Sequence, residues 1–420
     1  MKSQLIRSSL ASMLACASLA GALAATTYTL TDLGTGAAND INSTGKVVGN
    51  DAAGGWYFDG TNRTTPHFMA QYPNTPPGPP PYSLSPTMVL AINDADQILG
   101  STYLPLDPTG NLNGYVYDLA HTNSVAALLG PQRHPTGIGS NGEVVGNGFT
   151  FDGTNIGGLS GFGAVGLAIN SAGLIVGYAS PNDSGYPTAT VFAGGTNSQP
   201  DLSPLYDIVG PRRNSYLFSV NDAGQMVGEL EYAGSSPFNS AQVSVAFLYT
   251  NGTAVNLGGL GGFRSEARDI NNAGLIVGNS MVADQTFHAF VYANGAMADL
   301  NTLISSGGSG WVLTSANAVN DQGVIVGEGQ KDGVAHAFLL APATDTLPSA
   351  VHLLLQLTPD ASITVTGKVG QSFRIEAVDH VSDTVWQPLG NVTLTAATYL
   401  WVDSDSALHP SRFYRGVLLP

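Results

Sequence analysis

The sequence has one cysteine, few basic residues and, beyond its first 25 residues, no long apolar run. Cys16 lies within those 25 residues, so the remaining chain can use neither disulfides nor cysteine metal sites to hold its fold. Lys and Arg total 14 against 30 acidic residues, a balance that disfavours binding to nucleic acid or to an anionic membrane. No later run reaches the roughly 18 apolar residues of a membrane-spanning helix. The fold must therefore depend on packing alone, and we predict neither a nucleic-acid partner nor membrane insertion.

The first 25 residues have the organisation of a secretory signal peptide. Lys2 and Arg7 give a basic start, an apolar run follows from Leu10 to Ala24, and the Ala-Leu-Ala sequence at 22–24 offers a cleavage pattern. We therefore predict that residues 1–25 are a signal peptide and that the mature protein is secreted, extracellular or at the cell surface. Without Lys2 and Arg7, 12 basic residues remain against 30 acidic ones, a formal charge of −18.

One twelve-residue unit recurs seven times between residues 38 and 327. Most copies have Ile or Val before an Asn-x-x-Gly corner, then a short apolar stretch that ends in Val-Gly or Leu-Gly. Successive closing glycines are separated by 51, 46, 31, 51, 50 and 49 residues: Gly49, Gly100, Gly146, Gly177, Gly228, Gly278 and Gly327. A repeat of about 45–50 residues is typical of a four-stranded propeller blade or of an α-helical repeat of similar length.

Turn chemistry within the repeat favours strands. Asn bonds to the backbone that follows it and Gly accepts positive φ, so the Asn-x-x-Gly corner joins two strands. A third strand follows, as in "VAFLYTNG" and "HAFVYANG", where a two-residue Asn-Gly turn leads into a fourth strand such as "TAVNLGGL". Each unit is therefore predicted to be a four-stranded antiparallel meander.

The second strand of each meander predicts how the meanders pack. Its central pair is apolar at both positions, as in Val47-Val48 and Ile276-Val277, which indicates a strand covered on both faces. Meanders stacked around an axis satisfy this, and seven copies predict a seven-bladed β-propeller. The seventh copy supplies only three strands, ending at 336–342, and the segment 27–34 resembles a fourth strand. We predict that this N-terminal strand closes the ring, which removes an exposed sheet edge.

The repeats also resemble a known family. The His-Ala-Phe triplets at 288–290 and 336–338, the Ile-Asn-x-x-Gly-x-x-Val-Gly unit and the "LGGLGG" segment at 257–262 are similar to the HAF-repeat family of bacterial extracellular proteins, over residues 30–342. The first four copies depart from the pattern because they lack the His. The resemblance implies export and repetition, without an agreed activity.

The repeat pattern ends near residue 345. We predict a propeller over 26–345 and a small β-sandwich over 346–420, because the latter has short alternating strands and turn residues. Its "GQSFRIEA" and "RFYR" segments resemble the short fibronectin-like modules of secreted bacterial proteins. A Pro-rich insert at 72–86 is predicted to be a long extended surface loop.

Several recurring polar residues are predicted to be structural. The corner asparagines occur in six of the seven copies and satisfy turns: Asn42, Asn93, Asn170, Asn221, Asn271 and Asn320. His288 and His336 begin equivalent strands and are expected to pack or to hydrogen-bond at the blade edge. Asp40 and Asp269 occupy one equivalent position that faces the channel, where calcium is an alternative. Because blades 1 and 6 are not neighbours, we predict no metal site.

Arginines form the predicted ligand-binding set. Arg133, Arg212, Arg213 and Arg264 all fall in connections from an outer strand to the next inner strand. In a propeller these connections share a face with the loops between second and third strands, and loops on a rigid scaffold commonly bind ligands. Arginine suits carboxylate, phosphate or sulfate groups. The alternative is that these arginines pair with the abundant carboxylates or stack on neighbouring loops.

Enzyme motifs are missing. The chain has no G-x-S-x-G elbow, no H-E-x-x-H zinc motif and no phosphate-binding G-x-x-x-x-G-K loop. We predict a non-enzymatic binding or cell-surface module without a cofactor, whose ligand is an anionic carbohydrate or a protein. Two alternatives stay open, a propeller hydrolase or lyase acting on an acidic polysaccharide and a purely structural envelope or matrix protein, since propeller enzymes assemble sites from scattered loops.

Overall fold

The computed structural model describes most of the chain beyond residue 25. The described residues are 26–66, 68–70, 82–84, 87–103, 112–119, 125–131, 133–180, 186–209, 213–232, 243–343, 352–357, 361–366, 372–379, 385–394, 398–405 and 412–419. The predicted signal peptide, 1–25, lies outside them. Contacts divide the chain into two units, Met1–Ala343 and Thr344–Pro420.

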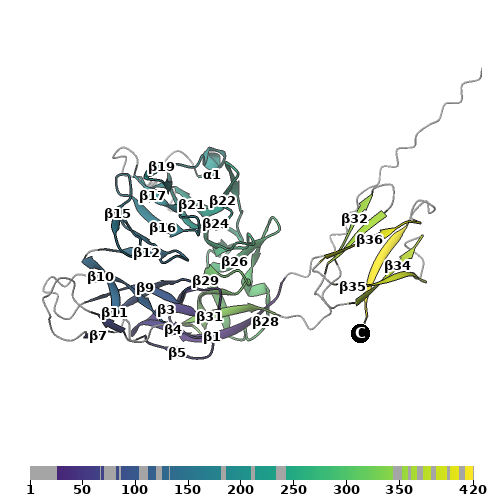
Figure 1. The fold of residues 1–420 in the computed structure, drawn as a ribbon, viewed down its shortest axis with the longest axis horizontal. Helices are drawn as coiled ribbons and strands as arrows, with labels where there is room; N and C mark the ends of the chain where they lie inside the picture. Colours follow the sequence, from purple (N-terminus) through teal and green to yellow (C-terminus); the bar gives the residue numbers. More distant parts are fainter. Residues whose placement is uncertain are drawn as a thin grey trace, which may run out of the picture. The chain divides into compact units, whose positions relative to one another are not determined.

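The first unit is built of antiparallel sheets that follow one another along the chain (Figure 1). Blades 1 to 3 consist of β2 (Ala37–Ile41), β3 (Val47–Asp51), β4 (Gly54–Phe58) and β5 (Arg63–Thr64); β8 (Met88–Ile92), β9 (Gln97–Tyr103), β10 (Leu112–Asp118) and β11 (Val125–Pro131); and β12 (Pro135–Ile138), β13 (Val144–Gly146), β14 (Phe149–Phe151) and β15 (Ile156–Gly158).

The same order continues through the later blades. Blades 4 to 6 consist of β16 (Val165–Ile169), β17 (Ile175–Ala179), β18 (Thr188–Ala193) and β19 (Thr196–Ser198); β20 (Arg213–Val220), β21 (Met226–Tyr232), β22 (Ser244–Thr250) and β23 (Thr253–Asn256); and β24 (Gly261–Ile270), β25 (Ile276–Val282), β26 (Phe287–Ala293) and β27 (Ala296–Asp299). Blade 7 combines β29 (Trp311–Val319), β30 (Ile325–Lys331) and β31 (Val334–Pro342) with β1 (Tyr28–Thr35). Within the described residues, this unit is an all-β propeller of seven such sheets.

The N-terminal strand joins the two ends of the propeller. β1 pairs antiparallel with β31, from Tyr28 opposite Pro342 to Thr35 opposite His336, and Figure 1 shows this purple strand beside the green ones. Arg63 of blade 1 donates to the carbonyl oxygens of Leu33 at 2.7 Å and Thr35 at 2.8 Å. The predicted closure by residues 27–34 is therefore confirmed.

The second strands are buried on both faces, as their apolar pairs predict. Val47, Val48, Val144, Val145 and Val326 have no exposed surface. Each core cluster takes residues from neighbouring blades; one joins Val227 and Ala246 of blade 5 to Ala267 and Phe290 of blade 6. Burying apolar surface between sheets is the main stabilising contribution in a chain without disulfides.

The Pro-rich insert differs from its prediction. Residues 82–84 form strand β7 (Tyr82–Leu84), which pairs with β6 (Phe68–Ala70), and β6 pairs in parallel with β11. Blade 2 thus has six strands. The predicted loop is therefore wrong at 82–84, since a sequence rich in proline can still contain an edge strand. The rest of the insert, 72–81 and 85–86, lies outside the described residues.

Three further short elements lie in connections. β28 (Ile304–Ser306) pairs in parallel with β1 and makes blade 7 five-stranded. The helical turns η2 (Ser203–Leu205) and α1 (Tyr206–Val209) lie between blades 4 and 5, and η3 (Leu300–Thr302) follows β27. None of the described helices is long and apolar enough to cross a membrane.

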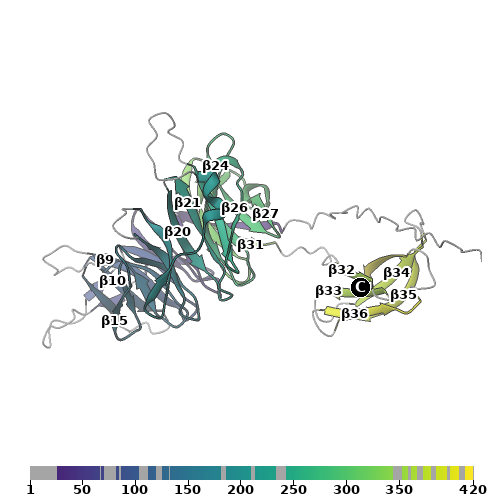
Figure 2. The ribbon, with the colours of Figure 1, turned by 90° about the horizontal axis from the view of Figure 1, so that it is seen from above.

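The second unit contains two three-stranded sheets. One has the order β32 (His352–Leu357), β33 (Ala361–Thr366), β36 (Thr398–Asp403); the other has the order β35 (Gln387–Thr393), β34 (Ser372–Val378), β37 (Phe413–Leu418). Val365 of the first sheet shares a core with Phe373, Ile375 and Val392 of the second. Figure 2 shows the two sheets of this unit from a second direction.

Candidate functional site: the channel mouth

The corner asparagines link each blade to the next. The Asn271 side chain accepts hydrogen bonds from the N–H groups of Ala273 and Leu275 in its own turn and donates to the carbonyl oxygen of Asn320 at 2.9 Å. The same donation runs from Asn42 to Asn93, from Asn170 to Asn221, from Asn221 to Asn271 and, across the closure, from Asn320 to Asn42. Asn93 donates to Gly139, which has no side chain to continue the ring. The asparagines are structural, as predicted.

Every inner strand contains a β-bulge at one equivalent position. The register between first and second strands shifts three residues before the corner in each blade. The bulged residues, named here the bulge ring, are Asn39, Leu90, Thr136, Leu167, Phe218, Arg268 and Asn317. A bulge leaves one residue out of the ladder and redirects its side chain, and bulges are common beside functional sites.

All seven bulge residues line one cavity of about 300 Å³ in the central channel. Every blade therefore contributes to this cavity, which is named here the mouth cavity. Connections between blades and the loops between second and third strands open on the same side, named here the linker face; the Asn-x-x-Gly turns lie on the opposite, corner face. The bulge ring is the candidate functional site.

Polar bulge residues also tie blades together. The Asn39 amide donates to the Val89 carbonyl oxygen at 2.6 Å, and the Asn317 amide donates to that of Ala38 at 2.8 Å. The Thr136 hydroxyl donates to the Gly166 carbonyl oxygen. Leu90, Leu167 and Phe218 have apolar side chains, and Arg268 contacts Glu266 of its own strand at 3.3 Å; all four line the cavity.

Two carboxylates lie directly below the bulge ring. Asp40 accepts from the N–H groups of Ile41 and, in blade 2, Ile92, both at 2.8 Å. Asp269 accepts from the Ser219 hydroxyl at 2.7 Å, from Ile270 N–H at 2.9 Å and from Val319 N–H of blade 7 at 2.8 Å. Both side chains line the mouth cavity. Each carboxylate thus bridges blades through neutral donors.

Burial dominates the titration of these carboxylates. Loss of water raises the pKa of Asp40 to about 7, although two N–H groups counteract it, and the charge of Asp269 raises it further. Burial also raises the pKa of Asp269 despite its three donors. Because neutral hydrogen bonds compensate a buried charge incompletely, the channel floor favours either a proton or a cation.

The corner end of the channel has its own cavity, of about 220 Å³. Residues that follow the corners line it, and their side chains bond to neighbouring turns; Asp222 accepts from Ser171 N–H at 3.0 Å and Asp321 accepts from Asn272 N–H at 2.8 Å. No group of three or more His, Cys, Asp or Glu residues is placed to hold a metal ion in the part of the chain that the structure describes.

A second acidic group lies on the linker face between blades 5 and 6. Burial raises the pKa of Glu229 to about 7; the Ser244 hydroxyl and Arg264 lower it, whereas Glu266 and Glu231 raise it. Glu231 accepts from the Asn214 amide at 2.8 Å. Nothing in the sequence points to these residues, because the two blades must pack together before Glu229 and Glu231 of blade 5 come close to Arg264 and Glu266 of blade 6.

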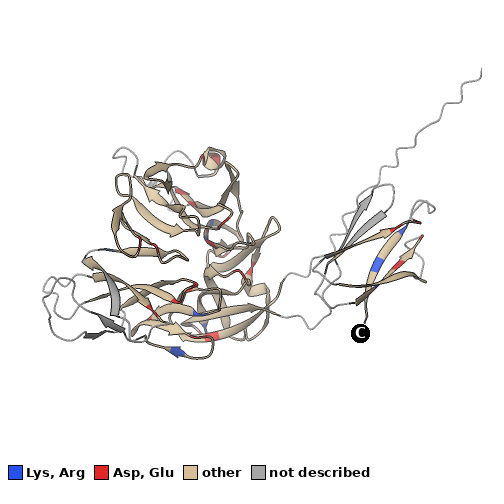
Figure 3. Cartoon of the chain, viewed as in Figure 1, with Lys and Arg blue, Asp and Glu red and all other residues tan. Residues whose placement is uncertain are grey.

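The structure separates the predicted arginines. The Arg133 guanidinium lies 5.3 Å from the Phe149 ring centre, and that of Arg264, three blades further on, lies 5.6 Å from the Phe287 ring centre. Arg213 begins β20, its side chain is not described, and Arg212 lies outside the described residues. Arg264 is close enough to Glu229 to lower its pKa. Arg133 and Arg264 therefore cannot contact one small anion together. Figure 3 shows how few charged residues the strands carry.

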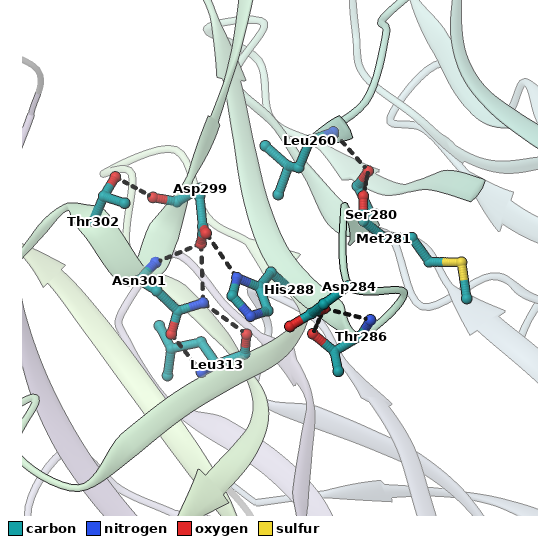
Figure 4. A network of polar contacts seen from close by, with 10 residues as sticks. All are labelled: Leu260, Ser280, Met281, Asp284, Thr286, His288, Asp299, Asn301, Thr302 and Leu313. Carbon is teal, nitrogen blue, oxygen red and sulfur yellow. Dashed lines mark hydrogen bonds and ion pairs between the residues drawn. The ribbon is translucent and has the colours of Figure 1, made fainter. Parts of the chain in front are cut away.

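The two histidines form equivalent pairs at the blade edge. His288 Nδ1 lies 2.7 Å from Asp299 of the fourth strand, and His336 Nδ1 lies 2.9 Å from Asp32 of β1. Asp299 also accepts from the Asn301 N–H and amide, and Asn301 bonds to Leu313 of blade 7 (Figure 4). These pairs hold outer strands and the next connection, in agreement with the predicted edge role.

Exposed apolar side chains gather on the linker face. Among the described residues of the propeller, nine large apolar side chains are exposed, and six of them lie at strand ends or loops of this face: Met88, Tyr103, Phe162, Tyr186, Val312 and Val334. The others are Ile156 and Val255 in outer strands and Ile208 in α1. No corner carries one. Exposed apolar side chains are thus more frequent on the linker face than at the corners.

No protein-family model and no curated protein matches this chain. Among solved structures, the chain is similar to the β-propeller domain of the Trilobed protease from Pyrococcus furiosus, with 9% identity, a TM-score of 0.45 and coverage of 74% of this chain and 95% of that one. It is also similar to the extracellular domain of BT4673 from B. thetaiotaomicron, with 10% identity, a TM-score of 0.44 and coverage of 82% and 46%. TolB from Acinetobacter baumannii has 11% identity, a TM-score of 0.26 and coverage of 64% and 61%.

Proposed function

We propose that this chain is an exported binding protein whose ligand contacts the linker face of the propeller and the bulge ring at its centre. The ligand class is carbohydrate or protein, with Arg133 and Arg264 available to separate anionic groups. Membership of the HAF-repeat family is part of the same proposal, since that resemblance implies an exported repeat protein.

One observation carries the proposal. The repeats hold the same residues where structure requires them, at the corner asparagines and the closing glycines, but differ at the bulge position. That position carries two Asn, two Leu, one Thr, one Phe and one Arg, and all seven side chains meet in one cavity. A position whose side chains converge from all blades and differ from copy to copy is expected of a binding site on a repeated scaffold.

An array of carbohydrates and proteins tests the proposal on the mature chain. Phe162, which is 68% exposed on the linker face, is replaced by Ser; the matched control replaces Ile156, which is 45% exposed in an outer strand. We expect the Phe162→Ser variant to lose binding and the Ile156→Ser variant to retain it. Arg133→Ala and Arg264→Ala test the anionic contacts. Equal loss in both Ser variants, or no binding by the intact protein, contradicts the proposal and favours a structural envelope protein.

A hydrolase or lyase acting on acidic polysaccharide is the second candidate, and Glu229 favours it. A general acid needs a pKa near the working pH, and burial raises that of Glu229 to about 7 beside Glu231 and Glu266. Incubation of the mature protein with acidic polysaccharides, followed by measurement of new reducing ends and of unsaturated products, tests this candidate. Turnover that Glu229→Gln abolishes supports the enzyme; binding without products supports the binding protein.

A further inference from the structure

We propose that the channel mouth binds a small zwitterion with an apolar side chain, that is, a free apolar α-amino acid. Its ammonium group lies between Asp40 and Asp269, its carboxylate contacts Arg268, and its side chain lies against the apolar bulge residues. This inference rests on the proposed function, because it specifies a ligand for the centre of the same face.

The mouth cavity has an apolar side and a polar side. Blades 2, 4 and 5 contribute the bulge residues Leu90, Leu167 and Phe218, and none of these three is part of the described core clusters. Blades 6, 7 and 1 contribute Arg268, Asn317 and Asn39. A ligand that fills this cavity therefore has an apolar part and a charged or polar part.

The floor of the cavity is formed by Asp40 and Asp269, and within the described residues no basic side chain donates to either carboxylate. All the hydrogen-bond donors to Asp40 and Asp269 are neutral, namely four backbone N–H groups and one hydroxyl. The charges that raise their pKa values are also acidic, namely Asp269 and then Asp94 for Asp40, and Asp321 for Asp269. An ammonium group is a compact cation with three donors, and its positive charge offsets the repulsion between the two carboxylates.

Arg268 supplies the opposite charge at the rim. Its side chain is 40% exposed, and one nitrogen lies 3.3 Å from Glu266, a long contact for an ion pair. The guanidinium has five N–H donors, which leaves donors free for a ligand carboxylate. Arg268 and Asp269 are consecutive residues at one bulge, and both line the cavity.

Size agrees with such a ligand. The cavity volume of about 300 Å³ lies at the lower end of the range for small-molecule pockets, roughly 300–1,000 Å³. A polymer chain contacts the rim but does not fit the floor. The inference therefore predicts a low-molecular-weight ligand that is distinct from any carbohydrate or protein at the outer loops.

Binding of an ammonium group is expected to strengthen with rising pH. Asp40, with a pKa of about 7, is about one-tenth ionised at pH 6 and about nine-tenths ionised at pH 8, so the affinity should rise roughly tenfold. The charged groups around the floor are Asp94, Asp321, Arg268 and Glu266.

Isothermal titration calorimetry of the mature full chain tests the inference. The probes are L-leucine, isopentylamine, 4-methylpentanoate and glucose, each at pH 6 and pH 8. We expect L-leucine to bind, isopentylamine to bind more weakly, and the carboxylate and the sugar not to bind. L-leucine should bind about tenfold tighter at pH 8 than at pH 6. At pH 6 the heat of binding should differ between buffers of different ionisation enthalpy, because the buffer takes up the proton that Asp40 releases.

Each test variant introduces a residue that another blade has at the equivalent position. Asp40→Ala introduces the alanine of blade 2, Asp269→Ser the serine of blade 5 and Arg268→Leu the leucine of blade 4. Each carboxylate variant should weaken the binding of L-leucine at least tenfold, and Asp40→Ala should also remove the pH dependence. Arg268→Leu should bring the affinity for L-leucine down to that for isopentylamine. Melting temperatures identify any variant that fails to fold. If a carboxylate variant does not fold, Arg268→Leu still tests the inference, because Arg268 is exposed and its replacement should leave the fold intact. Ile156→Ser is the control.

Outcomes separate this inference from the proposed function. The zwitterion inference is wrong if glucose binds in a way that needs Asp40. It is also wrong if Arg268→Leu and the carboxylate variants bind L-leucine as tightly as the unmodified protein does. Absence of L-leucine binding overturns it too, while array binding that depends on Phe162 leaves the proposed function standing. L-leucine binding with a silent array supports the mouth site and contradicts the outer carbohydrate or protein surface.

Discussion

Removal of one corner asparagine should weaken both a turn and a contact between blades. Asn271→Ala deletes two hydrogen bonds accepted from Ala273 and Leu275 and one donated to Asn320, at 3.1, 2.9 and 2.9 Å. Asn271 is only 5% exposed, so water replaces these bonds poorly. A buried hydrogen bond contributes about 1 kcal/mol, which gives a loss of about 3 kcal/mol in the free energy of unfolding.

Chemical denaturation of the mature chain at pH 7, followed by tryptophan fluorescence and circular dichroism, measures this loss. A unit of this size should also melt about 5 °C lower. Asn271→Asp separates the two contributions, because it keeps an acceptor for the turn and removes the donor to Asn320. We expect Asn271→Asp to lose the contact between blades at pH 7 and to accelerate amide exchange at the turn of blade 7.

The neighbouring Asn272→Ala serves as a control, since Asn272 is exposed and its amide bonds mainly to the exposed Asp222 and Asp321. It should cost less than 1 kcal/mol. If Asn271→Ala also costs less than 1 kcal/mol, the ring of asparagines does not stabilise the propeller and the reasoning is wrong.

Three further predictions concern the closure and the channel. Hydrogen bonds from Lys331, His336 and Gly34 outweigh burial and lower the pKa of Asp32 to about 2, so the protein should lose stability as the pH falls from about 4 to 2. Melting curves of Asp32→Asn should lack that acid dependence. An unchanged dependence refutes this assignment. Arg63→Ala removes donors to Leu33 and Thr35, so hydrogen exchange should quicken at 33–35 but not in blade 4; uniform exchange would contradict a local latch. The raised pKa of Asp40 implies that its ionised form disfavours the fold, so unliganded protein should gain stability as pH falls from about 8 to 5. Asp40→Ala should reduce this change of stability with pH. Glu229→Gln is measured in parallel because burial also raises the pKa of Glu229. If Asp40→Ala shows the same change of stability with pH as the unmodified protein, the prediction is wrong.

The repeated strands and corners could be predicted because their causes are local. An Asn at a corner bonds within five residues, a Gly permits positive φ, and an apolar pair reports burial on both faces, so these features determine a strand wherever they occur. The pairing of 27–34 with 336–342 also followed, since a three-stranded last copy and an orphan strand complete each other. Residues 82–84 were missed because an edge strand among prolines has no periodic pattern.

The candidate site depended on tertiary structure. A bulge is a one-residue shift between two paired strands, and whether Leu90 or Ala91 leaves the ladder is decided by the partner strand rather than by either residue alone. One signal was readable in principle: the position three before each corner differs between copies, whereas the corner Asn is kept in six copies and the closing Gly in all seven. Arg133 and Arg264 both precede the corner of their repeat, but they belong to blades 3 and 6, which are three blades apart around the ring. Local bonding thus determined each blade from sequence, whereas the convergence of seven side chains on one channel arises only when the ring closes.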